Sequence, residues 1–136
     1  MYPYTEEAHM QKILIIEDDR FLRELLVQKL LKEGYELQEA ADGEEGLNMA
    51  GQERPSLILL DLILPRMDGF EVLRQLKEQE GTKNIPVIIL SNLGQQEDID
   101  KGIQLGAADY MVKAHFTPAE VLLKIKQALP EEGKSI

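Results

Sequence analysis

The sequence contains no cysteine and no tryptophan, and aromatic residues make up only 5% of it. The lack of cysteine excludes a disulfide framework, so an apolar core must hold the 136 residues together. A single domain of this length can bury such a core without cross-links. Histidine is scarce as well, and the two present, His9 and His115, argue against a site with several histidine ligands.

Long apolar runs are also missing, because no aliphatic stretch exceeds five residues. A membrane-spanning helix needs about 20 such residues, and the N-terminus lacks the basic and apolar regions of a signal peptide. We therefore expect a cytoplasmic protein without a membrane partner. Positive charge is sparse too, since 25 acidic residues stand against 15 Lys and Arg, a net charge of −10. Phosphate-backbone binding needs a basic surface, so we expect no direct binding to nucleic acid.

The first ten residues differ from the rest of the chain. They show no periodicity and end in His9-Met10, a dipeptide that cloning often leaves before a native start. We interpret residues 1–10 as a flexible extension or a tag remnant. The expected domain covers residues 11–130, and residues 131–136 form a short tail.

Short aliphatic segments alternate with helical patterns along this domain. We predict strands at residues 12–16, 35–40, 55–61, 85–90 and 108–112. Between them, apolar residues recur at helix spacing, as in Leu22, Leu25, Leu26 and Leu30, and again in Val121, Leu122, Ile125 and Leu129. Five strands alternating with five helices predict an α/β fold, a parallel sheet with helices on both faces.

Helix boundaries can be read from capping residues. Three pairs have the spacing in which a cap and a Glu three residues later satisfy free N–H groups at a helix start: Asp42 with Glu45, Asp68 with Glu71, and Thr117 with Glu120. Asp19 is interpreted as a further cap, with metal binding as the alternative. Helices are expected to stop near Gly34, Gly51, Gly81 and Gly106.

Polar side chains stand where four of the predicted strands end. They are Glu17-Asp18-Asp19 after the first strand, Asp61 at the end of the third, Ser91-Asn92 after the fourth and Lys113 after the fifth. The carboxyl ends of parallel strands share one edge of the sheet, where open sheets of this kind bind ligands. Asp61 interrupts an aliphatic run at 57–64, and a place at this edge avoids the cost of an isolated charge in the core.

Carboxylates crowded at one edge repel one another unless a cation joins them. Mg²⁺ is the natural candidate, because it prefers oxygen ligands and binds through one or two carboxylates beside a phosphate. Lys113 and the Ser91 hydroxyl would then face the remaining phosphoryl oxygens. Such a set suits a carboxylate nucleophile that accepts phosphate, with catalysis by positioning and charge neutralisation.

Four segments resemble the receiver domain of two-component response regulators in their order and spacing. They are IIEDD at 15–19, LLDLILPRMDG at 59–69, VIILSN at 87–92 and GAADYMVKAHF at 106–116. The resemblance implies a three-layer, flavodoxin-like (CheY-like) (βα)5 fold with strand order 2-1-3-4-5. It also implies a bacterial signalling domain, not an enzyme, that receives a phosphoryl group from a sensor histidine kinase or a phosphotransfer protein.

By position, the resemblance makes Asp61 the phosphoacceptor in a Mg²⁺-dependent reaction. Asp18 looks like a direct ligand of the ion, and Glu17 like an acid that reaches it through water. The backbone carbonyl of Ile63 would supply a further metal ligand.

The resemblance also implies a switch. Ser91 would turn toward the phosphoryl group, Lys113 would pair with it, and Tyr110 matches the aromatic residue whose rotamer reports the change. The face built from the fourth helix, fifth strand and fifth helix would then bind a downstream protein or form a homodimer.

Two features depart from the family pattern or tune it. Lys113 is followed by Ala114, where the family commonly has a proline in a cis bond. A cis bond before alanine costs about 3–4 kcal/mol, so we expect either a strained cis bond or a trans bond with a shifted loop. Ile63 and Leu93 occupy positions that border the path of attacking water in the family, and apolar groups there predict slow self-dephosphorylation.

Two other functions remain open. An aspartate-nucleophile phosphohydrolase also places a carboxylate and Mg²⁺ at a strand end, but it usually carries a second acid two residues later, where this chain has Ile63. A pseudo-receiver that acts only as a binding module is the third interpretation, and the complete set of acids, hydroxyl and amine argues against it. The segment after Leu129 is too short for a DNA-binding helix pair, so we expect a stand-alone receiver or a piece of a longer regulator.

Overall fold

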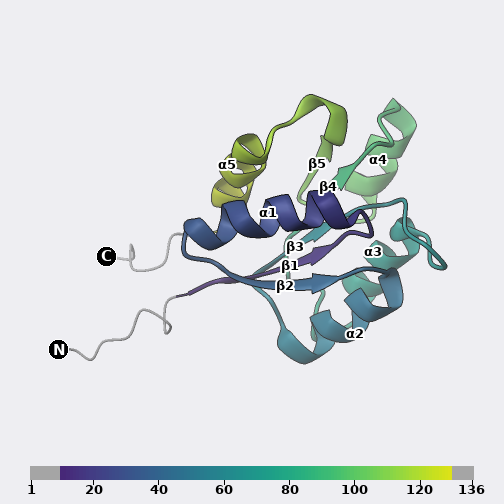
Figure 1. The fold of residues 1–136 in the computed structure, drawn as a ribbon. Helices are drawn as coiled ribbons and strands as arrows, with labels where there is room; N and C mark the ends of the chain where they lie inside the picture. The colour runs from purple at the N-terminus through teal and green to yellow at the C-terminus, as the bar shows by residue number, and fades with distance from the viewer. Residues whose placement is uncertain (1–9, 130–136) are drawn as a thin grey trace.

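The computed structural model describes residues 10–129, so the predicted tail and nearly all of the predicted N-terminal extension lie outside the described residues. Figure 1 shows a central sheet with helices on both sides. The strands are β1 (Lys12–Ile16), β2 (Glu36–Ala40), β3 (Leu57–Leu60), β4 (Val87–Ser91) and β5 (Asp109–Val112). All neighbouring strands pair in parallel, in the order β2-β1-β3-β4-β5. The predicted fold and strand order are confirmed.

Within residues 10–129, one α-helix follows each strand. The helices are α1 (Arg20–Lys32), α2 (Gly43–Glu53), α3 (Gly69–Glu78), α4 (Gln96–Gln104) and α5 (Pro118–Ala128), so that α1 to α4 connect successive strands and α5 comes after β5. Helices α1 and α5 pack on one face of the sheet, whereas α2 and α3 pack on the other (Figure 1). None of the helices within residues 10–129 is long and apolar enough to cross a membrane. The cytoplasmic location stays a prediction.

The core is split by the sheet into two apolar clusters. One contains Leu14, Ile16, Ile58 and Leu60 together with residues of α2 and α3, and the other contains Ile13, Ile15, Leu57 and Leu59 together with residues of α1 and α5. Successive residues of a strand point to opposite faces. Both faces of β1 and β3 are therefore buried, which explains why these strands are uninterrupted aliphatic runs.

The helix starts follow the predicted caps. Asp19 accepts a hydrogen bond from the Leu22 N–H at 3.2 Å, which confirms its capping role. Thr117 and Glu120 form the full reciprocal box at the start of α5. Asp68 caps α3 through the Phe70 N–H instead of the Glu71 N–H.

The predicted helix ends are correct at two glycines and wrong at two. Gly34 and Gly106 follow α1 and α4 with φ angles of 93° and 113°, which a glycine adopts without strain. Gly51 lies inside α2, which continues to Glu53 and ends with Arg54 in the left-handed conformation, just before Pro55. Helix α3 ends at Glu78, three residues before Gly81. A glycine can adopt the positive φ that ends a helix, but of these four glycines only Gly34 and Gly106 do so.

Candidate functional site

The acids predicted to meet at one sheet edge do so. Oxygen atoms of Glu17, Asp18 and Asp61 all lie within 4.8 Å of one another. Glu17 and Asp18 follow β1, and Asp61 follows β3, which is paired with β1. Glu17 and Asp61 are 2% and 4% exposed, whereas Asp18 is open to solvent. Three carboxylates in this arrangement can offer oxygen ligands to a hard cation, as Mg²⁺ prefers.

Lys113 joins the two buried acids. Its Nζ lies 2.9 Å from Glu17 Oε1 and 3.0 Å from Asp61 Oδ2. The peptide bond from Lys113 to Ala114 is trans, and a short 3-10 turn at Lys113–His115 follows β5. Of the two geometries expected for this bond, the strained cis form is therefore wrong. The amine reaches the acids without it.

Burial and neighbouring charges shift the pKa values of Glu17 and Lys113. Burial raises the pKa of Glu17 to about 7, and the Asp61 charge adds to the rise, although hydrogen bonds from Lys113 and from the Asp19 N–H favour the ionised form. Burial lowers the pKa of Lys113, but the hydrogen bonds to Glu17 and Asp61 outweigh it and leave this pKa above its ordinary value. Lys113 is therefore a cation at neutral pH.

Both oxygens of Asp61 have hydrogen-bond donors. Oδ1 accepts from the Ile63 N–H at 3.2 Å, and Oδ2 accepts from Lys113. The backbone approaches closely here, because a Cβ on Gly69 would overlap the Cα of Leu62 and lie 2.6 Å from the Asp61 carbonyl oxygen. The Gly69 N–H donates to the Leu62 carbonyl at 3.0 Å. The start of α3 thus presses on the segment that carries Asp61.

Ser91 and Tyr110 both hydrogen-bond to Leu93, which lies in the loop between β4 and α4. Ser91 is the last residue of β4, fully buried, and its Oγ accepts a hydrogen bond from the Leu93 N–H at 3.3 Å. The Tyr110 hydroxyl donates to the Leu93 carbonyl at 2.5 Å. Burial, aided by the charges of Asp98 and Asp61, raises the pKa of Tyr110 to about 12, so this hydroxyl keeps its proton. Leu93 therefore links the predicted hydroxyl residue to the predicted aromatic residue.

One residue near the site was missed from the sequence. Arg23 of α1 donates a hydrogen bond to the backbone carbonyl of Glu17 at 2.7 Å. The available signal was its place four residues after the cap Asp19, because helical side chains lean toward the N-terminus and cover the preceding turn.

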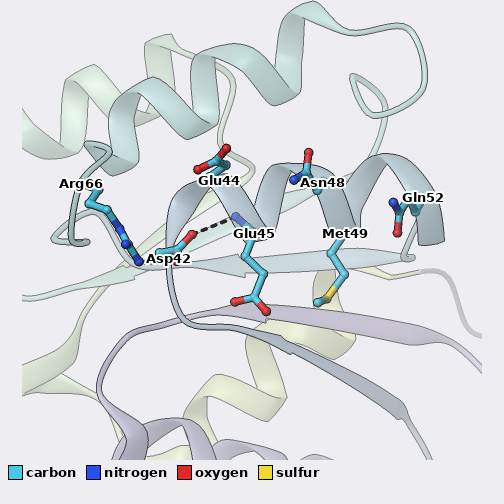
Figure 2. A pocket seen from close by; sticks show the side chains of 7 residues that line it. All are labelled: Asp42, Glu44, Glu45, Asn48, Met49, Gln52 and Arg66. Atoms are coloured by element: carbon cyan, nitrogen blue, oxygen red, sulfur yellow. Dashed lines mark hydrogen bonds and ion pairs between the residues drawn. The ribbon is translucent and has the colours of Figure 1, made fainter.

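A separate hollow of about 460 Å³ lies along α2. It is lined by Asp42, Glu44, Glu45, Asn48, Met49, Gln52 and Arg66. Figure 2 shows that Glu44 and Asn48 point to one side of the helix and Glu45 and Met49 to the other. These side chains do not converge on one point, so we assign the hollow no ligand.

Comparisons with known proteins agree with this geometry. The family model of the response regulator receiver domain matches residues 13–126. The DNA-binding dual master transcriptional regulator RpaA of Synechocystis sp. is 42% identical over 120 residues, which are 88% of this chain and 49% of RpaA. The alkaline phosphatase synthesis transcriptional regulatory protein PhoP of Bacillus subtilis is 40% identical over 119 residues, 88% of this chain and 48% of PhoP. This chain spans about half the length of these relatives.

Solved structures are similar over most of the chain. The chemotaxis response regulator CheY4 of Vibrio cholerae has a TM-score of 0.82 and 32% identity, covering 88% of this chain and 99% of that one. The receiver domain of the Francisella response regulator 1452 has a TM-score of 0.80 and 30% identity, covering 86% and 94%.

Proposed function

Because the chain belongs to the response regulator receiver domain family, whose general function is phosphorylation on an aspartate, we propose that Asp61 is the residue that accepts the phosphoryl group. The observation that carries this assignment is the shared position of the Asp61 carboxylate, hydrogen-bonded to Lys113 and within 4.8 Å of the oxygens of Glu17 and Asp18. Family membership gives the domain a signalling role rather than that of an enzyme. We propose residues 11–130 as its extent.

We propose Mg²⁺ as the cofactor, held by Asp18 and Asp61 directly, by Glu17 through water and by the carbonyl of Ile63. The fit rests on the donor set, since the three clustered side chains offer only carboxylate oxygens. When bound, the ion would supply positive charge that neutralises the phosphoryl oxygens.

The chain's own residues would carry the transfer. An Asp61 oxygen forms the new P–O bond as the P–N bond to the donor histidine breaks, and the imidazole leaves with the electron pair of that bond. Lys113, already bonded to Asp61 Oδ2, stays close enough to pair with the transferred group. Catalysis therefore comes from positioning and charge.

The switch would run through Leu93. If the Ser91 hydroxyl turns to the phosphoryl group, it gives up the Leu93 N–H, and the Leu93 carbonyl that holds Tyr110 moves with it. Tyr110 lies on β5 beside α4, so we propose the α4-β5-α5 face as the surface that binds a downstream protein or a second copy.

The partners follow from the family. Response regulators interact with histidine kinases, and we propose such a kinase or a phosphotransfer protein as the phosphoryl donor. RpaA is named as DNA-binding, and this chain matches only half of it. Our expectation of no nucleic-acid binding therefore applies to the receiver domain alone, and in a longer protein the domain would control a DNA-binding output.

Phosphorylation with acetyl phosphate and Mg²⁺, followed by intact-mass spectrometry, tests the acceptor. We expect a single phosphoryl addition that Asp61→Asn abolishes. Asp19→Asn is the matched control, because asparagine caps a helix as well as aspartate does, and its uptake should equal that of the wild type. Uptake by Asp61→Asn at the normal rate would show that another residue is the acceptor. Repeated turnover of a phosphate ester would favour the phosphohydrolase.

The lifetime of the phosphoryl group is a second prediction. The Ile63 side chain is exposed and apolar, and Leu93 lies on the adjacent loop, so neither can orient a water by hydrogen bonding. We expect slow decay of phospho-Asp61 with Mg²⁺ present, and decay several times faster in Ile63→Gln. Decay of the wild type within seconds contradicts the prediction, and an unchanged rate in Ile63→Gln removes its cause.

A further inference from the structure

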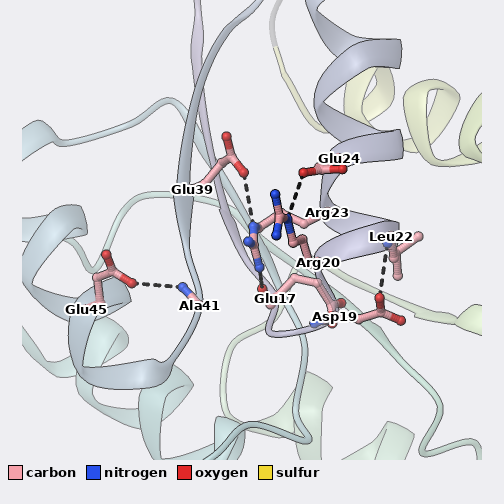
Figure 3. A network of polar contacts seen from close by, with 9 residues as sticks. All are labelled: Glu17, Asp19, Arg20, Leu22, Arg23, Glu24, Glu39, Ala41 and Glu45. Atoms are coloured by element: carbon pink, nitrogen blue, oxygen red, sulfur yellow. Dashed lines mark hydrogen bonds and ion pairs between the residues drawn. The ribbon is translucent and has the colours of Figure 1, made fainter.

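Arg23 of α1 is a charged residue held in a largely buried position. Its side chain is only 16% exposed, and its guanidinium reaches two other elements. Nη1 donates to the backbone carbonyl of Glu17 at 2.7 Å, and Nε donates to Glu39 Oε1 on β2 at 3.0 Å. Figure 3 shows the guanidinium lying between Glu39 and Glu17. Arg23 therefore joins α1 to β2 and to Glu17, the residue that follows β1.

The bond to Glu17 fixes a particular piece of backbone. The Glu17 carbonyl belongs to the planar peptide unit that leads directly into Asp18. The other polar groups of Glu17 are also bonded, since its N–H donates to the Ala40 carbonyl and its carboxylate accepts from Asp19 N–H and Lys113 Nζ. With Arg23 in place, the backbone on both sides of the solvent-exposed Asp18 is anchored, through the Glu17 carbonyl before it and the Asp19 N–H after it.

We propose that Arg23 is a positioning residue for the cation site, because it fixes the Glu17–Asp18 peptide and with it the direction of the Asp18 carboxylate. This inference rests on the proposed role of Asp18 and Asp61 as metal ligands. Groups that orient metal ligands from behind commonly change metal affinity about 10- to 100-fold when removed.

An electrostatic role and a positioning role of Arg23 predict opposite effects on the Mg²⁺ affinity when the residue is replaced. A guanidinium close to the acids repels a divalent cation, so its charge alone weakens metal binding. Removing that charge would tighten binding if Arg23 acted only through electrostatics. Removing a positioning contact would weaken binding in spite of the more negative site.

Calorimetric titration of the purified protein with Mg²⁺ separates these cases. We expect Arg23→Gln to bind Mg²⁺ about tenfold more weakly than the wild type. Arg23→Lys keeps the charge but cannot bond both Glu17 and Glu39 in the fork geometry of a guanidinium, so it should recover only part of the affinity. Glu39→Gln removes the ion pair at an exposed carboxylate, and we expect a smaller loss of affinity than in Arg23→Gln.

Arg20→Gln is the matched control. Arg20 lies three residues earlier on the same helix, its side chain is 82% exposed, and it pairs with Glu24 rather than with the site. The variant loses the same charge, so its Mg²⁺ affinity should stay within about twofold of wild type or become tighter, since exposed charges are screened.

Thermal unfolding with EDTA gives the readout for a purely structural role. If the role of Arg23 is purely structural, Arg23→Gln unfolds at a lower temperature but binds Mg²⁺ with unchanged affinity. Unchanged or tighter Mg²⁺ binding by Arg23→Gln overturns the proposal. If Arg23→Gln does not fold, unchanged affinity in both Arg23→Lys and Glu39→Gln overturns it. A wild type that binds no Mg²⁺ refutes the proposed metal site and this inference together, whereas a wild type that binds with an unaffected Arg23→Gln refutes this inference alone.

Discussion

A carboxylate as buried as that of Glu17 loses most of the water that favours its ionised form. Lys113 and the Asp19 N–H return part of that stabilisation through hydrogen bonds, but burial outweighs them, and the nearby Asp61 charge acts in the same direction as burial. The result is an acid that holds its proton up to about pH 7, against an ordinary value near 4.5. This single side chain therefore couples folding to pH in the neutral range.

The coupling has a definite sign. Between pH about 4.5 and about 7, the folded chain keeps the Glu17 proton while the unfolded chain has released it. At this group the unfolded state then binds fewer protons, so the contribution of Glu17 to the free energy of unfolding falls as pH rises through this window. Urea unfolding in EDTA at pH 5, 6, 7 and 8 should show this fall in the wild type and a flatter curve in Glu17→Gln. Parallel curves would contradict the raised pKa.

For single residues, the sequence predicted that the acids and Lys113 lie together, but it did not predict which neighbouring residues contact them. Asp18, Asp61 and Lys113 could be placed together because strand ends share an edge in a parallel sheet. The bond from Arg23 to the Glu17 carbonyl had a local signal in its spacing from Asp19, but the bond to Glu39 depends on how α1 packs beside β2, which no local pattern specifies. The Lys113-Ala114 geometry also had to come from the structure, since the sequence left both isomers possible.

Among the elements, the junction of β3 and α3 is the tightest place in the site. Gly69 begins α3 directly against the backbone of Asp61 and Leu62, where no side chain fits. Gly51 lies in the last turn of α2, two residues before its end, with nothing within 4 Å of a Cβ added there. Glycine therefore allows a close backbone approach at Gly69 in α3, whereas the space beside Gly51 in α2 would accept a larger side chain.

Identical substitutions at these glycines should have opposite effects. Gly69→Ala forces backbone apart, so we expect a loss of about 1–3 kcal/mol in unfolding free energy or more, and slower phosphorylation as the Asp61 segment shifts. Gly51→Ala should instead stabilise the protein by about 0.5–1 kcal/mol, because alanine has less unfolded-state freedom and a better helix propensity. Urea unfolding measures both, and a stable, fully active Gly69→Ala would contradict the close contact.

The elements themselves were largely predictable. All five strands appear within two residues of their expected bounds, because both-sided burial leaves aliphatic runs that are hard to mistake. The ends of α2 and α3 were not predicted correctly, because the sequence does not show which backbone angles Gly51 and Gly81 adopt. Capping side chains proved better guides than glycines because each makes a specific hydrogen bond.

The whole molecule carries a net charge of −10, and it gathers three carboxylates at one end of its sheet. A ligand that binds only the folded chain stabilises it in proportion to the logarithm of its concentration. We expect Mg²⁺ at a hundred times its Kd to add about 2.7 kcal/mol to the unfolding free energy, and Asp18→Asn to lose most of this gain. Thermal unfolding measures it.

Salt alone can stabilise a chain of this charge by screening repulsion. Sodium chloride at matched ionic strength is therefore the control, and only the excess effect of Mg²⁺ counts as site binding. Equal stabilisation by both salts, or an unchanged response in Asp18→Asn, would contradict a specific ion site.

The strands all begin at the edge opposite the acids, and Glu36 opens β2 there with an exposed side chain. Because the 136-residue sequence has no cysteine, Glu36→Cys would introduce a single thiol that can be labelled selectively. A dye or spin label attached at that position sits a full strand length from Asp61. Labelled protein could thus report encounters with a kinase by fluorescence or electron spin resonance while the reacting end stays untouched.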